Sequence, residues 1–253
     1  MSKRGQLTVF MIIGVVLVVV IAIMVVYRSA ITETINKEVL QKEVSLPPDV
    51  QKVRDYVQDC IEDASPMLLY QIGAQGGLLV FTENKGFTKD DVYIAYGYYK
   101  NKNVLPSLGD FENDYAKFMN NYLPICLSAG EFGKLEVVPL KPSTNLEFFD
   151  DKVRVTVDYP LTVNQEGGVY NLRDAYKVEY PLRIKFMHDI GDRIIKKVES
   201  DPKNIDISYL LDLGVDVTIY PYDKDVIIYS IQDTKSVVGD TPYVYRFVVR
   251  FGA

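Results

Sequence analysis

The chain has 253 residues, of which 12% are aromatic and 25% are charged, and its 28 basic and 34 acidic side chains give a net charge of −6. An acidic chain argues against a nucleic-acid partner, because phosphate binding needs a basic surface. One histidine and two cysteines do not supply the Cys/His ligands of a structural zinc site. We therefore expect no nucleic acid, no metal and no cofactor.

An uncharged apolar run covers residues 7–26, and Thr8 is its only hydroxyl residue. As a helix this run would be about 30 Å long, which matches the hydrocarbon core of a bilayer. A buried core helix would carry a polar residue somewhere on its surface. A cleavable signal would have a shorter apolar region and a small-x-small cleavage site, which Val25-Val26-Tyr27-Arg28 does not offer. The pattern predicts an uncleaved transmembrane helix over residues 7–27 that contacts the lipid bilayer.

The orientation of this helix follows from the charges around it. Residues 1–6 include Lys3 and Arg4 and no acidic residue, and such a basic tip stays in the cytoplasm. The rest of the chain is then expected outside the membrane, as a single-pass protein. Without Lys3 and Arg4 the chain has 26 basic and 34 acidic residues, a net charge of −8. This balance argues against docking of the outer part on anionic lipid.

Helical spacing continues beyond the apolar run. Residues 28–48 form a predicted stalk, with Ile31, Ile35, Val39 and Leu40 on one side, and Pro47-Pro48 ends it. A helix is then expected from Asp49, a favourable N-cap, to about residue 73, with a kink or a break at Pro66. The turn Gln75-Gly76-Gly77 leads into predicted strands over residues 78–81 and 92–99.

The remaining chain mixes helices with alternating strands. A second helix is predicted from Gly109-Asp110, and its expected apolar face consists of Phe111, Tyr115, Phe118, Met119, Tyr122, Ile125 and Cys126. Strands follow over residues 134–139, 152–163 and 176–184, and the last two are predicted to form a hairpin around Gly167-Gly168. Helices are predicted over residues 186–198 and 207–213, and a three-stranded meander over residues 215–220, 226–231 and 243–251.

This order of elements favours an α+β fold, because it lacks the regular strand–helix alternation of a doubly wound sheet. We expect one extracytoplasmic domain over residues 49–253, built from antiparallel strands and three to four helices. Residues 141–144 are the one candidate for a seam between two smaller domains, since no Gly/Ser/Pro-rich linker divides this region.

The first residues carry a resemblance to a known family. The sequence Lys3-Arg4-Gly5-Gln6-Leu7-Thr8-Val9-Phe10, followed by the aliphatic run, resembles archaeal type IV pilin-like proteins with class III signal peptides. The resemblance implies cleavage by a membrane peptidase between Gly5 and Gln6, and self-assembly through the apolar helix. Phe10 departs from this family, in which many members have Glu at that position. A plain signal-anchor with a basic start is the other interpretation.

The outer part is similar to uncharacterised single-pass membrane proteins of small-genome archaea. The residues that carry this resemblance are Val57-Gln58-Asp59-Cys60-Ile61, Gln75-Gly76-Gly77 and Leu123-Pro124-Ile125-Cys126-Leu127. That family has no assigned activity that could be transferred.

Cys60 and Cys126 both fall on apolar helix faces in the expected outer part, where an oxidising environment permits a disulfide between them. The alternative is two buried thiols that pack as small apolar groups.

No catalytic motif stands out. His188, beside Asp189, is the only candidate imidazole base, and a helix-surface or capping role is the alternative. Acidic residues form two groups, Asp55, Asp59, Glu62 and Asp63 in the first and Asp110, Glu112 and Asp114 in the second. Pairs of these carboxylates could bind calcium or cleave glycosides. Solvent-exposed helix faces have the same pattern, which is the alternative interpretation.

The 19 tyrosines fall largely in predicted strands, where they are either half-buried or form a surface for a sugar or a protein. The sequence favours a membrane-anchored protein of the cell envelope with a structural or binding role toward a protein or glycan outside. A pilin-like subunit is the assembled form of this hypothesis. The alternative is an envelope hydrolase that uses an acidic pair or His188.

Overall fold

The structure is a computed structural model that describes residues 46–82, 84–89, 91–202 and 204–252. It divides into two units between Pro47 and Pro48, and every described helix and strand belongs to the unit Pro48–Ala253. The predicted transmembrane helix, the Gly5–Gln6 bond and residues 28–45 of the stalk lie outside the described residues. Within the part of the chain that is described, no helix has both the length and the apolar character needed to cross a membrane.

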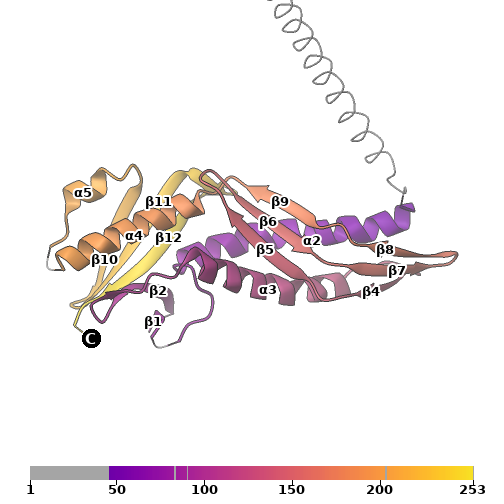
Figure 1. Cartoon of the computed structure of the whole chain (residues 1–253), viewed down its shortest axis with the longest axis horizontal. Coiled ribbons are helices and arrows are strands. Elements are labelled where there is room, and N and C mark those ends of the chain that lie inside the picture. Colours follow the sequence, from indigo (N-terminus) through magenta and orange to yellow (C-terminus); the bar gives the residue numbers. More distant parts are fainter. Residues whose placement is uncertain (1–45, 83, 90, 203, 253) are drawn as a thin grey trace, which may run out of the picture. The chain divides into compact units, whose positions relative to one another are not determined.

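The unit Pro48–Ala253 has an α+β fold in which most strands are antiparallel, so the predicted fold class is confirmed (Figure 1). Its described helices number four, and they are α2 (Pro48–Ala74), α3 (Leu108–Ser128), α4 (Ile184–Ser200) and α5 (Ile207–Leu211).

The largest sheet has six strands, in the order β1-β2-β12-β11-β10, with β3 paired to β2. The C-terminal meander was predicted, and it pairs with β2 through the only parallel pair among the described strands, β2 with β12. The six strands are β1 (Gly86–Lys89), β2 (Val92–Tyr99), β3 (Lys102–Asn103), β10 (Asp216–Asp223), β11 (Val226–Val238) and β12 (Thr241–Arg250).

Two three-stranded sheets complete the fold, and the strands in each of them pair antiparallel. In Figure 1 the β4-β7-β8 sheet lies beside the N-terminal end of α2, and the six-stranded sheet lies at the other end of this helix. The first sheet contains β4 (Glu136–Pro139), β7 (Leu161–Gln165) and β8 (Gly168–Leu172), and the second contains β5 (Ser143–Phe148), β6 (Val153–Asp158) and β9 (Tyr176–Tyr180).

The predicted hairpin around Gly167-Gly168 is right in one respect and wrong in another. The strands β6 and β9 are antiparallel neighbours, as expected, but the glycine turn joins β7 to β8 instead. Tyr159-Pro160 interrupts the single strand predicted over residues 152–163, since proline cannot donate to a strand ladder. Residues 143–148, which include part of the candidate seam, form β5.

The helix α2 differs in detail from its prediction. It begins at Pro48, so Asp49 lies in its first turn rather than at the N-cap. Proline suits this first position because its missing N–H would have no partner there. The helix also continues through Pro66 to Ala74 without a break, and the chain then turns at Gly76 and Gly77, where φ is +81° and +94°.

The apolar face predicted for α3 is only partly correct. Its buried residues are Phe111, Tyr115, Met119, Leu123 and Leu127, which recur every four residues along one stripe. Phe118 and Ile125 lie outside this stripe, and 46% and 67% of their surfaces are exposed. The helix begins after the N-cap Ser107, which forms a capping box with Asp110.

The strand predicted over residues 78–81 is absent. The N–H groups of Leu79 and Val80 donate to Oδ2 of Asp114 on α3, over 2.7 Å and 3.3 Å. A side-chain carboxylate thus takes backbone donors that a neighbouring strand would otherwise bind, and the segment remains a loop.

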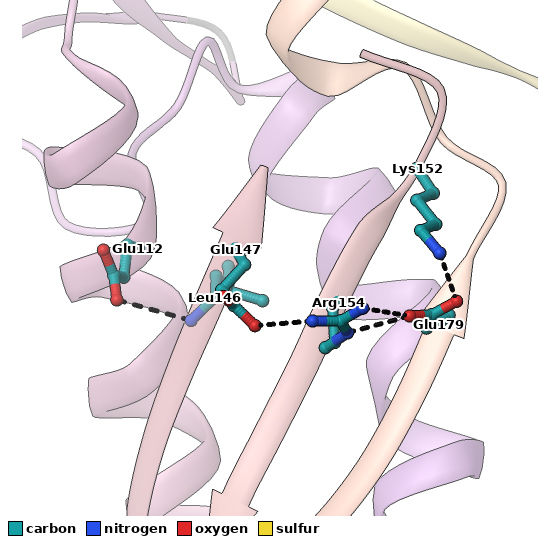
Figure 2. Close-up of polar contacts among 6 residues, drawn as sticks. All are labelled: Glu112, Leu146, Glu147, Lys152, Arg154 and Glu179. Carbon is teal, nitrogen blue, oxygen red and sulfur yellow. Dashed lines mark hydrogen bonds and ion pairs between the residues drawn. The ribbon is translucent and has the colours of Figure 1, made fainter. Parts of the chain in front are cut away.

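A row of charged side chains crosses β5, β6 and β9 on their exposed face, as Figure 2 shows. Arg154 on the central strand binds Glu147 on one neighbour and Glu179 on the other, over 3.2 Å and 2.8 Å. Lys152 also binds Glu179, over 2.7 Å. At the sheet edge, the Leu146 N–H donates to a carboxylate oxygen of Glu112 on α3. The opposite face of β6 is buried, so this sheet is held by apolar packing within and by ion pairs outside.

Candidate functional site

A stacked pair of tyrosines lies at the end of β2. The rings of Tyr96 and Tyr99 are 4.5 Å apart between centroids, with 8° between their planes. The turn that follows has Lys100 and Asn101 at φ values of +51° and +59°, as in a two-residue hairpin turn of type I′. This turn reverses the chain directly after Tyr99 and starts β3.

A second aromatic pair faces the same region from other strands. Phe87 on β1 meets Tyr222 on β10 edge to face, with centroids 5.0 Å apart. A register shift between Pro221 and Asp223 marks an irregularity in β10 at this tyrosine. Both aromatic pairs pack against one apolar cluster, whose buried members are Phe87, Ile94, Tyr96, Val226, Ile228 and Val248.

Three cations lie against these rings. The guanidinium of Arg250 donates from Nη1 to the hydroxyl of Tyr96 over 3.3 Å, and its carbon is 5.9 Å from the Tyr99 centroid. Lys100 Nζ is 5.1 Å from the Tyr99 centroid, and Lys89 Nζ is 5.5 Å from that of Tyr222. The hydrogen bond to Tyr96 raises the pKa of Arg250 above its ordinary value, so this group stays charged.

These residues form an open groove of about 480 Å³, which we name the aromatic–cationic groove. Its only lining carboxylate among the described residues is Asp223, and none of the described carboxylates forms an ion pair with Lys89, Lys100 or Arg250. The groove can therefore bind an anionic group beside an apolar body. It is lined by Gly86, Phe87, Thr88, Lys89, Tyr96, Tyr99, Asp223, Val226 and Arg250.

The two cysteines are joined in the structure. Cys60 on α2 and Cys126 on α3 form a disulfide, with their Cα atoms 6.3 Å apart. Close by, the hydroxyl of Tyr56 donates to the carbonyl oxygen of Cys126 over 3.2 Å. The sequence left a pair of buried thiols as the alternative, and the structure has the bond instead.

His188 is held by backbone and by an aromatic ring. Its Nε2 lies 2.9 Å from the carbonyl oxygen of Pro106, which can only accept, so this nitrogen carries the proton. Its ring packs on Tyr245, and its Nδ1 is 3.8 Å from Asp189. The contacts found within the described residues place the imidazole as a link between α4 and the loop before α3.

The two acidic groups have different environments. Asp55, Asp59, Glu62 and Asp63 lie exposed along α2, where Gln51 and Gln58 bind the first and third of them.

The acidic residues of α3 bind local donors. Asp110 closes the capping box, and the Ser107 side chain lowers the pKa of this carboxyl. Asp114 and Glu112 accept from backbone N–H groups, as described above. In the described part of the chain, no group of three or more His, Cys, Asp or Glu side chains could hold a metal ion.

No family model matches the chain, and neither a curated protein nor a solved structure matches it. The site therefore has to be judged from its own chemistry. The sequence offered the strand tyrosines as a whole as a possible binding surface, and those of residues 92–99 are among them. Lys89 and Arg250 were not predicted as part of this surface, because 160 positions separate them and only the parallel pairing of β2 with β12 brings them to one groove.

Proposed function

We propose that this chain is a membrane-anchored binding protein of the cell envelope, and that its α+β domain binds a partner outside the membrane through the aromatic–cationic groove. The observation that carries the proposal is this groove, in which cations and aromatic rings from separate strands converge. The volume of the groove lies within the range of about 300–1,000 Å³ that ligand pockets have.

The membrane part of the proposal is supported by the sequence. The uncharged run over residues 7–26 is long enough to span a bilayer, and Lys3 and Arg4 favour a cytoplasmic N-terminus. The finer architecture that we propose is a transmembrane helix over residues 7–27, a stalk over residues 28–48 and an extracytoplasmic domain over residues 49–253.

Cell fractionation tests this topology. The full chain is expected in the membrane fraction after lysis and in solution only after detergent. Protease added to intact cells is expected to remove the C-terminal domain. A variant with Val16→Lys and Val19→Lys, which interrupts the apolar run, is the matched control and is expected to leave the membrane fraction. A wild-type chain that stays soluble without detergent, or a domain protected in intact cells, contradicts the proposal.

A pilin-like subunit is the second candidate, and Lys3–Phe10 is the segment that favours it. If the chain is processed as this resemblance implies, the mature protein starts at Gln6. Mass spectrometry of the native N-terminus tests this, with a Gly5→Leu variant as the uncleaved control. An intact Met1–Gln6 segment in the native protein rules the processing out.

The hydrolase alternative stays a prediction with its own test. An envelope hydrolase that uses an acidic pair or His188 requires activity that His188→Ala or Asp59→Asn abolishes. The hydrogen bond from His188 to Pro106 supports a positional role for this imidazole instead. Hydrolysis of glycan or peptide substrates by the purified full chain, lost in either variant, would favour the enzyme over the binding protein.

A further inference from the structure

The aromatic–cationic groove has basic side chains on two walls and aromatic rings on its floor. Lys89 comes from the edge strand β1, and Arg250 comes from β12, two strands further into the sheet. Between them lie the rings of Phe87 and Tyr96, which are largely buried. A ligand that satisfies both walls must be anionic, and one that covers this floor must also have an apolar side.

One of the two cations is held in place before any ligand arrives. Arg250 is fixed by its hydrogen bond to Tyr96 and by its position beside Tyr99. The hydrogen bond uses one of the five N–H donors of the guanidinium, which leaves donors for a planar acceptor such as a carboxylate. Because little side-chain freedom remains to be lost, such a site binds its ligand at a lower entropic cost.

We propose that the groove binds a sugar that carries a carboxylate, such as a hexuronic acid residue of an envelope glycan. This inference rests on the proposed function and names its ligand class. The sugar carboxylate pairs with Arg250 and Lys89. The C–H face of the sugar ring packs against the exposed part of the Tyr99 ring. The ring hydroxyls donate to the carboxylate of Asp223.

Other anionic ligands fit these residues less well. A nucleic acid would need a long basic track, and the chain as a whole has a net charge of −6. Asp223 would repel a second negative charge, whereas it accepts hydrogen bonds from the hydroxyls of a sugar. An acidic peptide offers carboxylates without such hydroxyls, so the observations favour the sugar.

The test measures binding to the full chain in detergent micelles by isothermal titration calorimetry. The probes are trigalacturonic acid, the neutral galactotriose and triglutamate, each at two salt concentrations. We expect trigalacturonic acid to bind, galactotriose to bind about tenfold more weakly or worse, and triglutamate to be weaker than the acidic sugar. Higher salt is expected to weaken the binding of the acidic sugar, because screening reduces its pairing with exposed cations.

Variants locate the site. Arg250→Gln is expected to weaken binding of trigalacturonic acid about tenfold or more, and Lys89→Gln to weaken it less. Arg246→Gln is the matched control, because Arg246 lies on the same strand and donates to Ser230 rather than lining the groove. Arg250→Lys keeps the charge but removes the planar fork, and an intermediate affinity is expected. This variant and Lys89→Gln serve if Arg250→Gln does not fold.

Several results would overturn the inference. These are equal binding of the acidic and neutral sugars, tighter binding of triglutamate, no binding of any probe, or equal losses in the Arg250 and Arg246 variants. None of them bears on membrane anchoring, which the fractionation experiment tests separately. Conversely, a chain found soluble in cells would refute the anchor while the titrations still report on the groove.

Discussion

Arg183 and Asp233 form a two-pronged ion pair that ties the start of α4 to the middle of β11. Nε of Arg183 donates to Oδ2 over 2.9 Å, and Nη2 donates to Oδ1 over 2.6 Å. Only 2% of the Asp233 side chain is exposed, and Ser236 donates a further hydrogen bond to it over 2.6 Å. The same serine accepts from the N–H of Arg183. The pair lies where the register of β11 with β12 shifts, so it fixes an irregular part of the sheet.

Replacing Asp233 with Ala is expected to lower the free energy of unfolding by about 3 kcal/mol, because it leaves the Arg183 guanidinium without its partner in a partly buried place. Urea titration followed by circular dichroism measures the change. Asp150→Ala is the control, since its ion pair with Lys185 leaves 90% of the Asp150 side chain exposed and a negligible effect is expected. Equal effects of the two substitutions would contradict this role.

The same ion pair makes the free energy of unfolding depend on pH in the acidic range. Burial alone would raise the pKa of Asp233, but the hydrogen bonds from Arg183, Ser236 and the Lys235 amide outweigh it, and the pKa lies below its ordinary value. A carboxyl whose pKa is lower in the folded state than in the unfolded state stabilises the fold. This stabilisation is complete above the pKa of the unfolded state, about 3.9, and it is lost as the pH falls through the lower pKa of the folded state.

The wild-type chain should therefore lose stability more steeply than Asp233→Asn as the pH falls below about 4. Urea titrations between neutral and strongly acidic pH measure the two slopes. Parallel curves for the two proteins would show that other groups account for the acid sensitivity.

The disulfide between Cys60 and Cys126 closes a loop with a sequence separation of 66. Chain entropy predicts a stabilisation of about 4 kcal/mol, and residual structure in the unfolded chain reduces it. The double variant Cys60→Ala with Cys126→Ala should therefore unfold at lower urea concentration. Reductant should lower the wild-type midpoint and leave that of the variant unchanged. Two free thiols in the native protein without reductant would rule the bridge out.

Two buried tyrosines should respond differently to loss of their hydroxyl groups. Tyr115 donates to Ser65 over 2.7 Å, and Tyr115→Phe should cost about 1 kcal/mol. The hydroxyl of Tyr159 has no hydrogen-bond partner among the described residues, so Tyr159→Phe should be neutral or slightly stabilising. Thermal or urea unfolding of both variants measures the difference, and a reversed order would contradict the assignment.

Two helical glycines offer a similar contrast. A Cβ atom on Gly73 would overlap the ring of Tyr243 and the Val244 carbonyl, so Gly73→Ala should destabilise the fold by about 2 kcal/mol. Gly109 has only the Ser107 hydroxyl nearby, at 3.6 Å, and Gly109→Ala should stabilise the helix by up to about 1 kcal/mol. If both substitutions stabilise the protein, the close packing of α2 on β12 is wrong.

Local patterns predicted the elements whose residues repeat regularly. The aromatic and β-branched composition of residues 92–99 predicted β2, and the apolar spacing around Ile190 and Ile194 predicted α4. The failures have a common physical origin in contacts between distant residues. Asp114 keeps residues 78–81 out of a strand, and no local signal identifies that carboxylate as their partner.

The groove shows the same limit. Tyr96 and Tyr99 stand out in the sequence as an aromatic run, but nothing near Arg250 indicates that its guanidinium reaches Tyr96. The exposed side chains of Phe118 and Ile125 illustrate the opposite error, because apolar residues outside the buried stripe were assigned to the core. Periodicity shows that a helix has an apolar face, and tertiary packing decides which of its apolar residues are buried.

The position of β12 between β2 and β11 has a consequence for biosynthesis. The ribosome makes this strand after the other described strands, yet it joins the pair of β1 and β2 to the pair of β10 and β11. Until residues 241–250 emerge, β2 has no partner on that side, and the nascent polypeptide exposes an unpaired strand edge that favours aggregation. A chain truncated before Thr241 should consequently accumulate as aggregate or be degraded, however much of the preceding domain has been translated.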